Sequence, residues 1–116
     1  MTELPNLSVE GIYTHLAISE VLDDYNLRQH ALFAELLERL EDGHIRIPVR
    51  HMSNSGAVLN YPEFHFDMVR PGIMSYGIYP SAETASRAAL NPVMAFKTTV
   101  VLIKDFPQGA SIGYGR

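Results

Sequence analysis

The most regular pattern of hydrophobic and polar residues lies between Tyr25 and Glu41. Its apolar residues recur every three or four positions, which places them on one face of an α-helix. They are Leu32, Phe33, Leu36, Leu37 and Leu40. Asp23 or Asp24 can cap the first free N–H groups of this helix, and Gly43 can close its last turn. We expect the helix to serve packing and to carry no chemistry.

Shorter segments on either side of this helix predict β-strands. They are Val9–Ala17, Ile45–Met52 and Asp67–Pro71. The second of them leads into a polar turn, and Ala57–Leu59 predicts a short helix directly after it. Strands that alternate with helices are typical of βα units and a parallel sheet. The sequence therefore predicts an α/β fold with about three such units.

The residue composition of the chain changes after Pro92. Val93–Ile103 is dense in Val, Thr, Phe and Leu, which predicts a long strand. Phe106–Gly109 predicts a turn, and Ala110–Tyr114 predicts the start of another strand. We therefore expect a domain boundary near Leu90.

Size and charge exclude several classes of protein. The chain has 116 residues, of which 47% are hydrophobic and 19% charged, and its net charge is −4. This composition suits one modest core but not a complete (β/α)₈ barrel, which needs roughly 250 residues. The mild acidity gives no reason to expect nucleic acid or a membrane as partner. No cysteine is present, and no apolar run approaches the ~20 residues of a membrane span. A cytoplasmic location is expected by default.

Arg70 is the first candidate for binding chemistry. It precedes Pro71 and Gly72 at the end of the third predicted strand. Arginine keeps its proton and can only donate, and a glycine after proline lets backbone N–H groups approach an anion such as phosphate. A surface ion-pair arginine beside a type II turn explains the same spacing. Spacing alone leaves both interpretations open.

Three further features are ambiguous in the same way. The run Ser53–Gly56, at the start of a short helix, suits a phosphate, although such a run by itself is more often an N-cap. His15 can be a structural histidine at a strand end. His44 and His51 lie seven residues apart without a carboxylate pattern. They make a poor metal site, so we interpret them as structural or exposed and expect no metal.

Three separated stretches resemble one known family. Gly11–Ala17, Asn54–Ala57 and Met68–Gly77 look like the matching motifs of alanine racemase, a bacterial enzyme that uses pyridoxal 5′-phosphate (PLP) to interconvert L- and D-alanine. The resemblance covers essentially the whole chain, in the same order and with similar spacing. It implies that residues 1–90 are the C-terminal part of a PLP-binding (β/α)₈ barrel and that residues 91–116 begin a β-domain.

The resemblance also implies a set of cofactor-binding residues: His15, Asn54, Ser55, Arg70, Gly72 and Ile73. Ser55 and the backbone around Gly72 and Ile73 would hold the phosphate, and His15 would pack against the pyridine ring. Arg70 would face the pyridine nitrogen. Because Arg70 only donates, that nitrogen would stay an unprotonated acceptor, and the ring would be a weaker electron sink than one paired with a carboxylate. That property suits racemisation.

The family's Schiff-base lysine would lie upstream of Met1, and its catalytic tyrosine downstream of Arg116, acting across a homodimer interface. We therefore assign no catalytic residue here, and Lys97 and Lys104 match no catalytic position. The parent would supply D-alanine for cell-wall peptidoglycan, while this chain alone is expected to be inactive.

Other functions stay open at this point. One is a serine or broad-specificity racemase of the same fold. A second is a truncated, non-catalytic product that only self-associates. A third is a non-enzymatic PLP-binding protein without a β-domain, against which the predicted strands after residue 92 argue.

Overall fold

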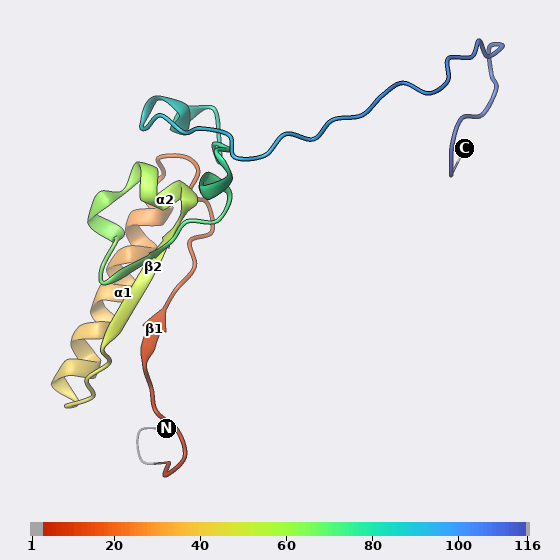
Figure 1. The fold of residues 1–116 in the computed structure, drawn as a ribbon. Coiled ribbons are helices and arrows are strands. Elements are labelled where there is room, and N and C mark those ends of the chain that lie inside the picture. The colour runs from red at the N-terminus through yellow and green to blue at the C-terminus, as the bar shows by residue number, and fades with distance from the viewer. Residues whose placement is uncertain (1–3, 116) are drawn as a thin grey trace.

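A parallel sheet of three short strands forms the centre of the fold (Figure 1). The computed structural model describes residues 4–115. The strands are β1 (Gly11–Tyr13), β2 (Val49–Asn54) and β3 (Met68–Arg70), and they lie side by side in chain order. Helix α1 (Asp24–Asp42) follows β1, and helix α2 (Ser55–Asn60) follows β2. The predicted succession of βα units is confirmed.

Three short 3₁₀ helices complete the described elements. They span Pro62–Phe64, Ile73–Tyr76 and Glu83–Ser86. The last two occupy the region after β3, where the third βα unit would have its helix. No helix among residues 4–115 is long and apolar enough to cross a membrane.

Helix α1 begins and ends where the sequence predicts. The Asp23 carboxylate accepts a hydrogen bond from the Tyr25 N–H at 2.7 Å, and the Gly43 N–H donates to the Arg39 carbonyl. These contacts satisfy backbone groups that a helix end would otherwise leave free. Such contacts are local in sequence, which is why the pattern alone predicts them.

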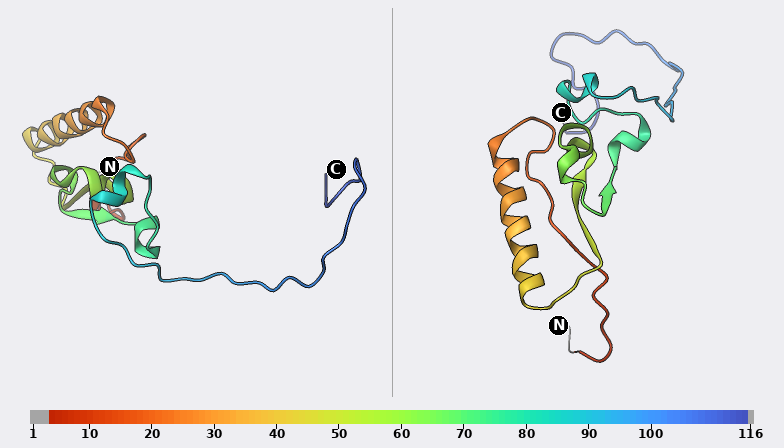
Figure 2. Two further views of the ribbon diagram at one scale, coloured as in Figure 1. Left: turned by 90° about the horizontal axis from the view of Figure 1, so that it is seen from above. Right: turned by 90° about the vertical axis from the view of Figure 1, so that its left-hand side faces the viewer.

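The apolar face of α1 is only partly covered. The helix runs alongside the sheet (Figure 2), and Phe33 and Leu37 are buried in the core. Leu32 and Leu36 lie on the same predicted face but stay 58% and 43% exposed. Together with Ile12 of β1, these two leucines line an open apolar hollow.

The core draws its residues from the loop after β1, from α1, β2 and α2, and from the segment directly after α2. Its members are Leu16, Phe33, Leu37, Met52, Ala57, Tyr61 and Phe64. Aromatic stacking organises its centre, since the Phe64 ring lies 4.6 Å from the Tyr61 ring and 4.4 Å from the His30 ring. Such pairs add roughly 0.5–1.5 kcal/mol to simple burial.

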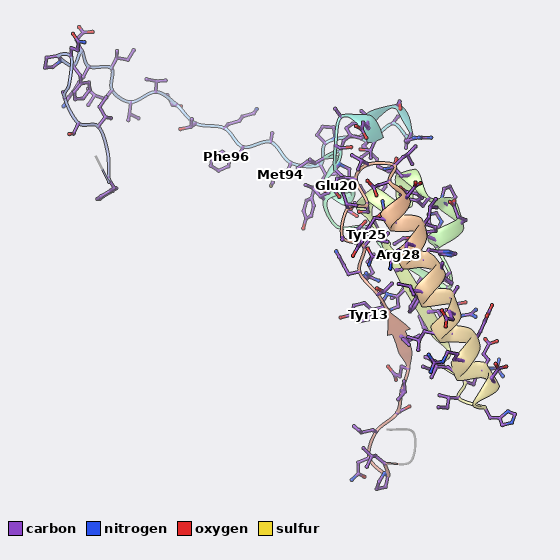
Figure 3. All side chains as sticks on the ribbon, turned by 180° about the vertical axis from the view of Figure 1, so that it is seen from behind. Tyr13, Glu20, Tyr25, Arg28, Met94 and Phe96 are labelled. Atoms are coloured by element: carbon purple, nitrogen blue, oxygen red, sulfur yellow. The ribbon has the colours of Figure 1, made fainter. Side chains whose placement is uncertain are left out.

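The strands predicted after residue 92 are absent. Val93–Ile103 is extended but belongs to no sheet, and every residue from 91 to 115 is exposed. Met94 and Phe96 stand away from the rest of the chain (Figure 3), and Phe96 is 97% exposed. A strand forms by pairing its backbone with a neighbour along its length, and within the described residues this segment has a single such bond, from the Val93 N–H to the Tyr76 carbonyl at 3.3 Å. The prediction of strands at Val93–Ile103 and Ala110–Tyr114 is wrong for this structure.

The turn between those two segments does form. The Ala110 N–H donates to the Pro107 carbonyl at 3.1 Å, and Gly109 adopts a φ of +86°. The expected boundary near Leu90, with residues 91–116 opening a β-domain, stays a prediction.

Candidate functional site

The functional candidates gather at one edge of the sheet. His15 lies two residues beyond the end of β1, Asn54 is the last residue of β2, and Arg70 is the last residue of β3. Because the strands are parallel, their carboxyl ends meet at the same edge, where ligands of α/β proteins usually bind.

An open cavity of about 400 Å³ lies at this edge. Its lining includes all six residues named from the sequence, which are His15, Asn54, Ser55, Arg70, Gly72 and Ile73. Ser19, Glu20, Gly56 and Pro80 complete the lining. Gly56 belongs to the run Ser53–Gly56 already considered for a phosphate, whereas Ser19, Glu20 and Pro80 were not assigned to a site from the sequence, because they reach the cavity only through folding.

Acceptors from β2 and from the residue that follows β1 hold the guanidinium of Arg70. One terminal nitrogen donates to the Thr14 carbonyl at 3.1 Å and to the Met52 carbonyl at 3.4 Å. The other contacts Nδ1 of His51, and the guanidinium carbon lies 5.1 Å above the Tyr13 ring. The alternative of a surface ion-pair arginine does not describe this residue, since no carboxylate contacts it among the described residues.

His51 has a larger role than the sequence indicated. It pairs in register with Tyr13 of β1, and the two rings stack with centroids 5.2 Å apart. Partial burial and the nearby Arg70 charge lower the pKa of His51 from its ordinary value of 6.5. Since Arg70 can only donate, Nδ1 of His51 must be the acceptor, which requires the neutral ring. Only the sheet register reveals this contact, so spacing could not predict it.

Helix α1 fixes the backbone around His15. The Gln29 side chain donates to the His15 carbonyl at 3.2 Å and accepts from the Ala17 N–H at 2.9 Å. The His15 ring itself is exposed, with Nδ1 at 3.3 Å from Arg70. The backbone of His15 is therefore held by α1, while the exposed side chain lines the cavity.

Ser55 and Asn54 differ in what they do at the start of α2. The Asn54 side chain accepts from the Ala57 N–H at 3.1 Å and is the N-cap. The Ser55 hydroxyl is buried and accepts from the Met74 N–H at 3.3 Å, which leaves its proton to donate. Gly72 lies beside this hydroxyl, and no side chain caps the 3₁₀ turn that follows it.

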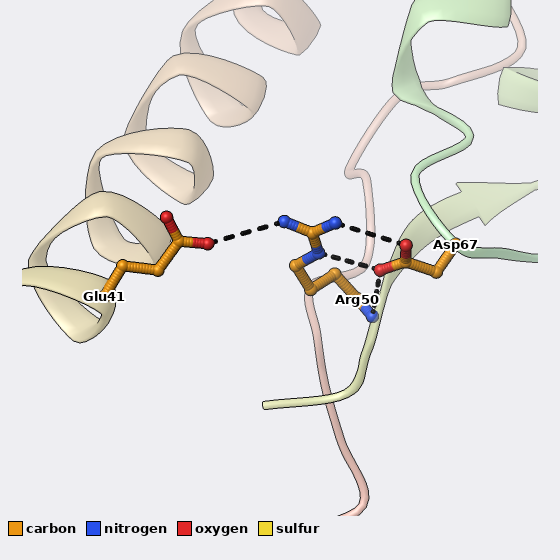
Figure 4. A network of polar contacts seen from close by, with 3 residues as sticks. All are labelled: Glu41, Arg50 and Asp67. Carbon is orange, nitrogen blue, oxygen red and sulfur yellow. Dashed lines mark hydrogen bonds and ion pairs between the residues drawn. The ribbon is translucent and has the colours of Figure 1, made fainter. Parts of the chain in front are cut away.

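A second arginine, Arg50, has a structural role. Its backbone and side chain donate three hydrogen bonds to Asp67, and Glu41 of α1 lies 3.7 Å away (Figure 4). The hydrogen bonds from Arg50 lower the pKa of Asp67 from 3.8 to about 2. This pair ties β2 to the start of β3 and does not line the cavity.

Metal chemistry and the two lysines find no support in the geometry. Within residues 4–115, no three His, Asp or Glu side chains lie close enough together to hold a metal ion. Lys97 and Lys104 lie on the exposed tail, away from the cavity.

Comparison with known proteins identifies the family. Residues 1–80 match the family model described as alanine racemase, N-terminal domain. The chain is 45% identical over 115 residues to an alanine racemase of Methanococcus maripaludis, and 44% identical over 117 residues to alanine racemase 2 of Caldanaerobacter subterraneus. These alignments cover 97% and 100% of this chain but 31% and 30% of the relatives.

Solved structures agree with this assignment. An alanine racemase of Clostridium difficile in complex with cycloserine matches 78% of this chain and 25% of its own, at 33% identity and a TM-score of 0.75. The alanine racemase of Bacillus anthracis with bound L-Ala-P matches 76% of this chain and 24% of its own, at 34% identity and a TM-score of 0.71. The chain spans about a third of the curated relatives' length, and it belongs to the alanine racemase family.

Proposed function

We propose that the cavity at the strand ends binds PLP and that the chain is part of a PLP-dependent racemase acting on alanine. The observation that carries this proposal is the meeting of His15, Ser55 and Arg70 in one cavity, from three different strand ends. A volume of about 400 Å³ is within the range of roughly 300–1,000 Å³ that small-molecule sites occupy.

The lining fits the chemical groups of PLP. A phosphate needs several donors, and the Ser55 hydroxyl and the backbone around Gly72 and Ile73 offer them on one side of the cavity. A flat heteroaromatic ring needs a flat partner, which the exposed His15 ring provides. A pyridine nitrogen needs a donor, and Arg70 can be nothing else.

Arg70 would set the protonation state of the ring nitrogen. When bound, PLP supplies an electron sink for removal of the α-proton of an amino acid. The fixed positive charge of Arg70 disfavours a second positive charge beside it, so the ring nitrogen would stay unprotonated. His51, held neutral and stacked on Tyr13, keeps the guanidinium in place.

The residues that move protons would come from elsewhere in a longer, homodimeric protein. Among the described residues that line the cavity, none is a lysine or a tyrosine. The chain covers only about 30% of its curated relatives, which leaves room for both groups. In this proposal the chain binds and orients the cofactor, and its product in the whole protein is D-alanine for the cell wall.

One observation favours a second candidate function. The exposed apolar segment Val93–Ile103 has unpaired backbone groups, which invite pairing between chains. The chain would then be a non-catalytic product that self-associates. Sedimentation across a range of concentrations distinguishes a self-associating chain from a monomer.

The test of PLP binding is a titration of the 116-residue chain followed by absorbance, with pyridoxal, which lacks the phosphate, as the matched ligand. We expect saturable binding of PLP and much weaker binding of pyridoxal. Equal affinities for the two ligands would contradict the assignment of a phosphate site.

A further inference from the structure

A buried serine, Ser19, connects the loop after β1 to the first turn of α2. It is 2% exposed. Its hydroxyl donates to Oδ1 of Asn54 at 2.6 Å, and its carbonyl accepts from the Asn60 side chain at 3.1 Å. A Cβ on Gly56 would lie 2.7 Å from the Ser19 carbonyl and hydroxyl, so only glycine allows this close approach.

The direction of these hydrogen bonds follows from the donors. The Ala57 N–H can only donate, so the Asn54 atom that faces it must be the amide oxygen. The Ser19 hydroxyl contacts the same oxygen and must therefore donate as well. Both acceptor positions of Oδ1 are then used. The amide nitrogen Nδ2 is the remaining polar atom of Asn54, and it is a donor.

We propose that Ser19 is a positioning residue for anion binding in the cavity. Together with the Ala57 N–H, the Ser19 hydroxyl holds Oδ1 and so fixes the Asn54 amide in the orientation that leaves Nδ2 to donate to a phosphate oxygen. This inference deepens the proposed function and rests on it, since the phosphate is that of PLP. Asn54 and Ser19 both line the cavity, which places the amide within reach of a ligand there.

The loop itself is held without the Ser19 hydroxyl. Asn26 of α1 donates to the Ile18 carbonyl at 2.9 Å and to the Val21 carbonyl at 3.2 Å. The Ser81 hydroxyl donates to the Glu20 carbonyl at 2.7 Å. Removing the hydroxyl of Ser19 should therefore leave the loop in place and release only the Asn54 amide.

The experiment compares Ser19→Ala with Ser53→Ala. Ser53 is a matched control because it is fully buried, precedes Asn54 directly and donates its hydroxyl to the Phe64 carbonyl at 2.9 Å. We expect Ser19→Ala to weaken PLP binding by roughly threefold to tenfold, the factor for one lost hydrogen bond. Pyridoxal binding should not change. Ser53→Ala should lower the melting temperature but leave the ratio of PLP to pyridoxal affinity unchanged.

A second measurement follows Asn54 without any ligand. In ¹H–¹⁵N spectra, Ser19→Ala should shift the Asn54 side-chain amide signals and speed hydrogen exchange of the Ala57 N–H, whereas Ser53→Ala should do neither. If the wild-type protein binds PLP no better than pyridoxal, the proposed function is contradicted. In that case the amide signals alone test whether Ser19 positions the Asn54 side chain. If Ser19→Ala kept the amide signals and exchange rates of the wild type, the inference would be overturned. It would also be overturned if the wild type preferred PLP to pyridoxal and Ser19→Ala kept the same ratio of the two affinities.

Discussion

The loop after β1 and the tail after residue 92 are both largely apolar in sequence, but only the loop is held by contacts with the rest of the fold. Residues 16–23, of which five are apolar, are joined to α1, to α2 and to Tyr61 by side-chain hydrogen bonds. Eight of the eleven residues 93–103 are also apolar, yet all of them are exposed. Apolar content therefore does not order a segment by itself, because burial and strand pairing both need a partner surface.

Two phenylalanines express this difference most sharply. Phe64 is 1% exposed and stacks between Tyr61 and His30, while Phe96 is 97% exposed. We expect Phe64→Ala to lower the free energy of unfolding by about 3–5 kcal/mol and Phe96→Ala to leave it nearly unchanged. Urea unfolding measures both. A similar loss for the two variants would mean that the tail is packed.

Arg70 and Lys97 make the corresponding comparison between two cations. Arg70 lies among acceptors at the cavity, and Lys97 lies on the tail. We expect Arg70→Ala to weaken PLP binding by roughly tenfold to a hundredfold, as for a lost charge-assisted hydrogen bond. Lys97→Ala should have no effect. Equal effects of the two variants on PLP affinity would count against the site.

The neutral state of His51 gives the cavity a pH dependence that the tail cannot have. The pKa of His51 is lower in the folded chain than its ordinary 6.5, so the unfolded chain binds this proton first. The stability that the neutral ring contributes is therefore fully present above pH 6.5 and is lost as the pH falls toward the lower folded pKa, where the folded ring gains its proton and loses the Arg70 contact. PLP affinity measured between pH 5 and 8 should fall on acidification.

The matched control for this pH series is His51→Gln, because the phosphate of PLP titrates near pH 6 itself. Glutamine has no proton to gain in this range, so the profile of this variant reports the ligand and the other groups of the cavity, including His15, without His51. We expect the wild type to lose more affinity than this variant on acidification. Parallel profiles would contradict the role of His51.

The smallest expected effect concerns Asp67, which is bonded to Arg50. Its folded pKa of about 2 is below the ordinary 3.8, so its contribution to stability is present above pH 3.8 and is lost as the pH falls through about 2. With Asp67→Asn, the free energy of unfolding should depend less on pH in the acid range. Added salt should reduce the difference in stability between the wild type and this variant, since the pair is exposed. A salt-independent difference would point to a cause other than this ion pair.

The features that the sequence could predict are those that depend on residues close together in the chain. The cap at Asp23, the helix to Asp42 and the turn at Gly109 depend on neighbouring residues, and all three form as expected. The register that brings His51 to Tyr13 and the fold that brings Ser19 to Asn54 depend on residues far apart in the chain. The sequence pattern carries no information about such contacts.

The tail failed as a prediction for the same reason. Strand propensity in Val93–Ile103 is high, but a strand also needs a partner, and propensity says nothing about one. The six cofactor residues were assigned through motifs that resemble alanine racemase, and their meeting in one cavity is consistent with that assignment. Their roles toward PLP stay a proposal.

The most direct measurement is the ¹⁵N chemical shift of the ring nitrogen of labelled PLP bound to the 116-residue chain. Arg70 donates and cannot accept, so we predict the shift of an unprotonated pyridine throughout the neutral pH range. Arg70→Glu, which replaces the donor by a carboxylate, should move the signal toward the protonated value. A protonated nitrogen in the wild type, or the same shift in both proteins, would contradict the proposed site.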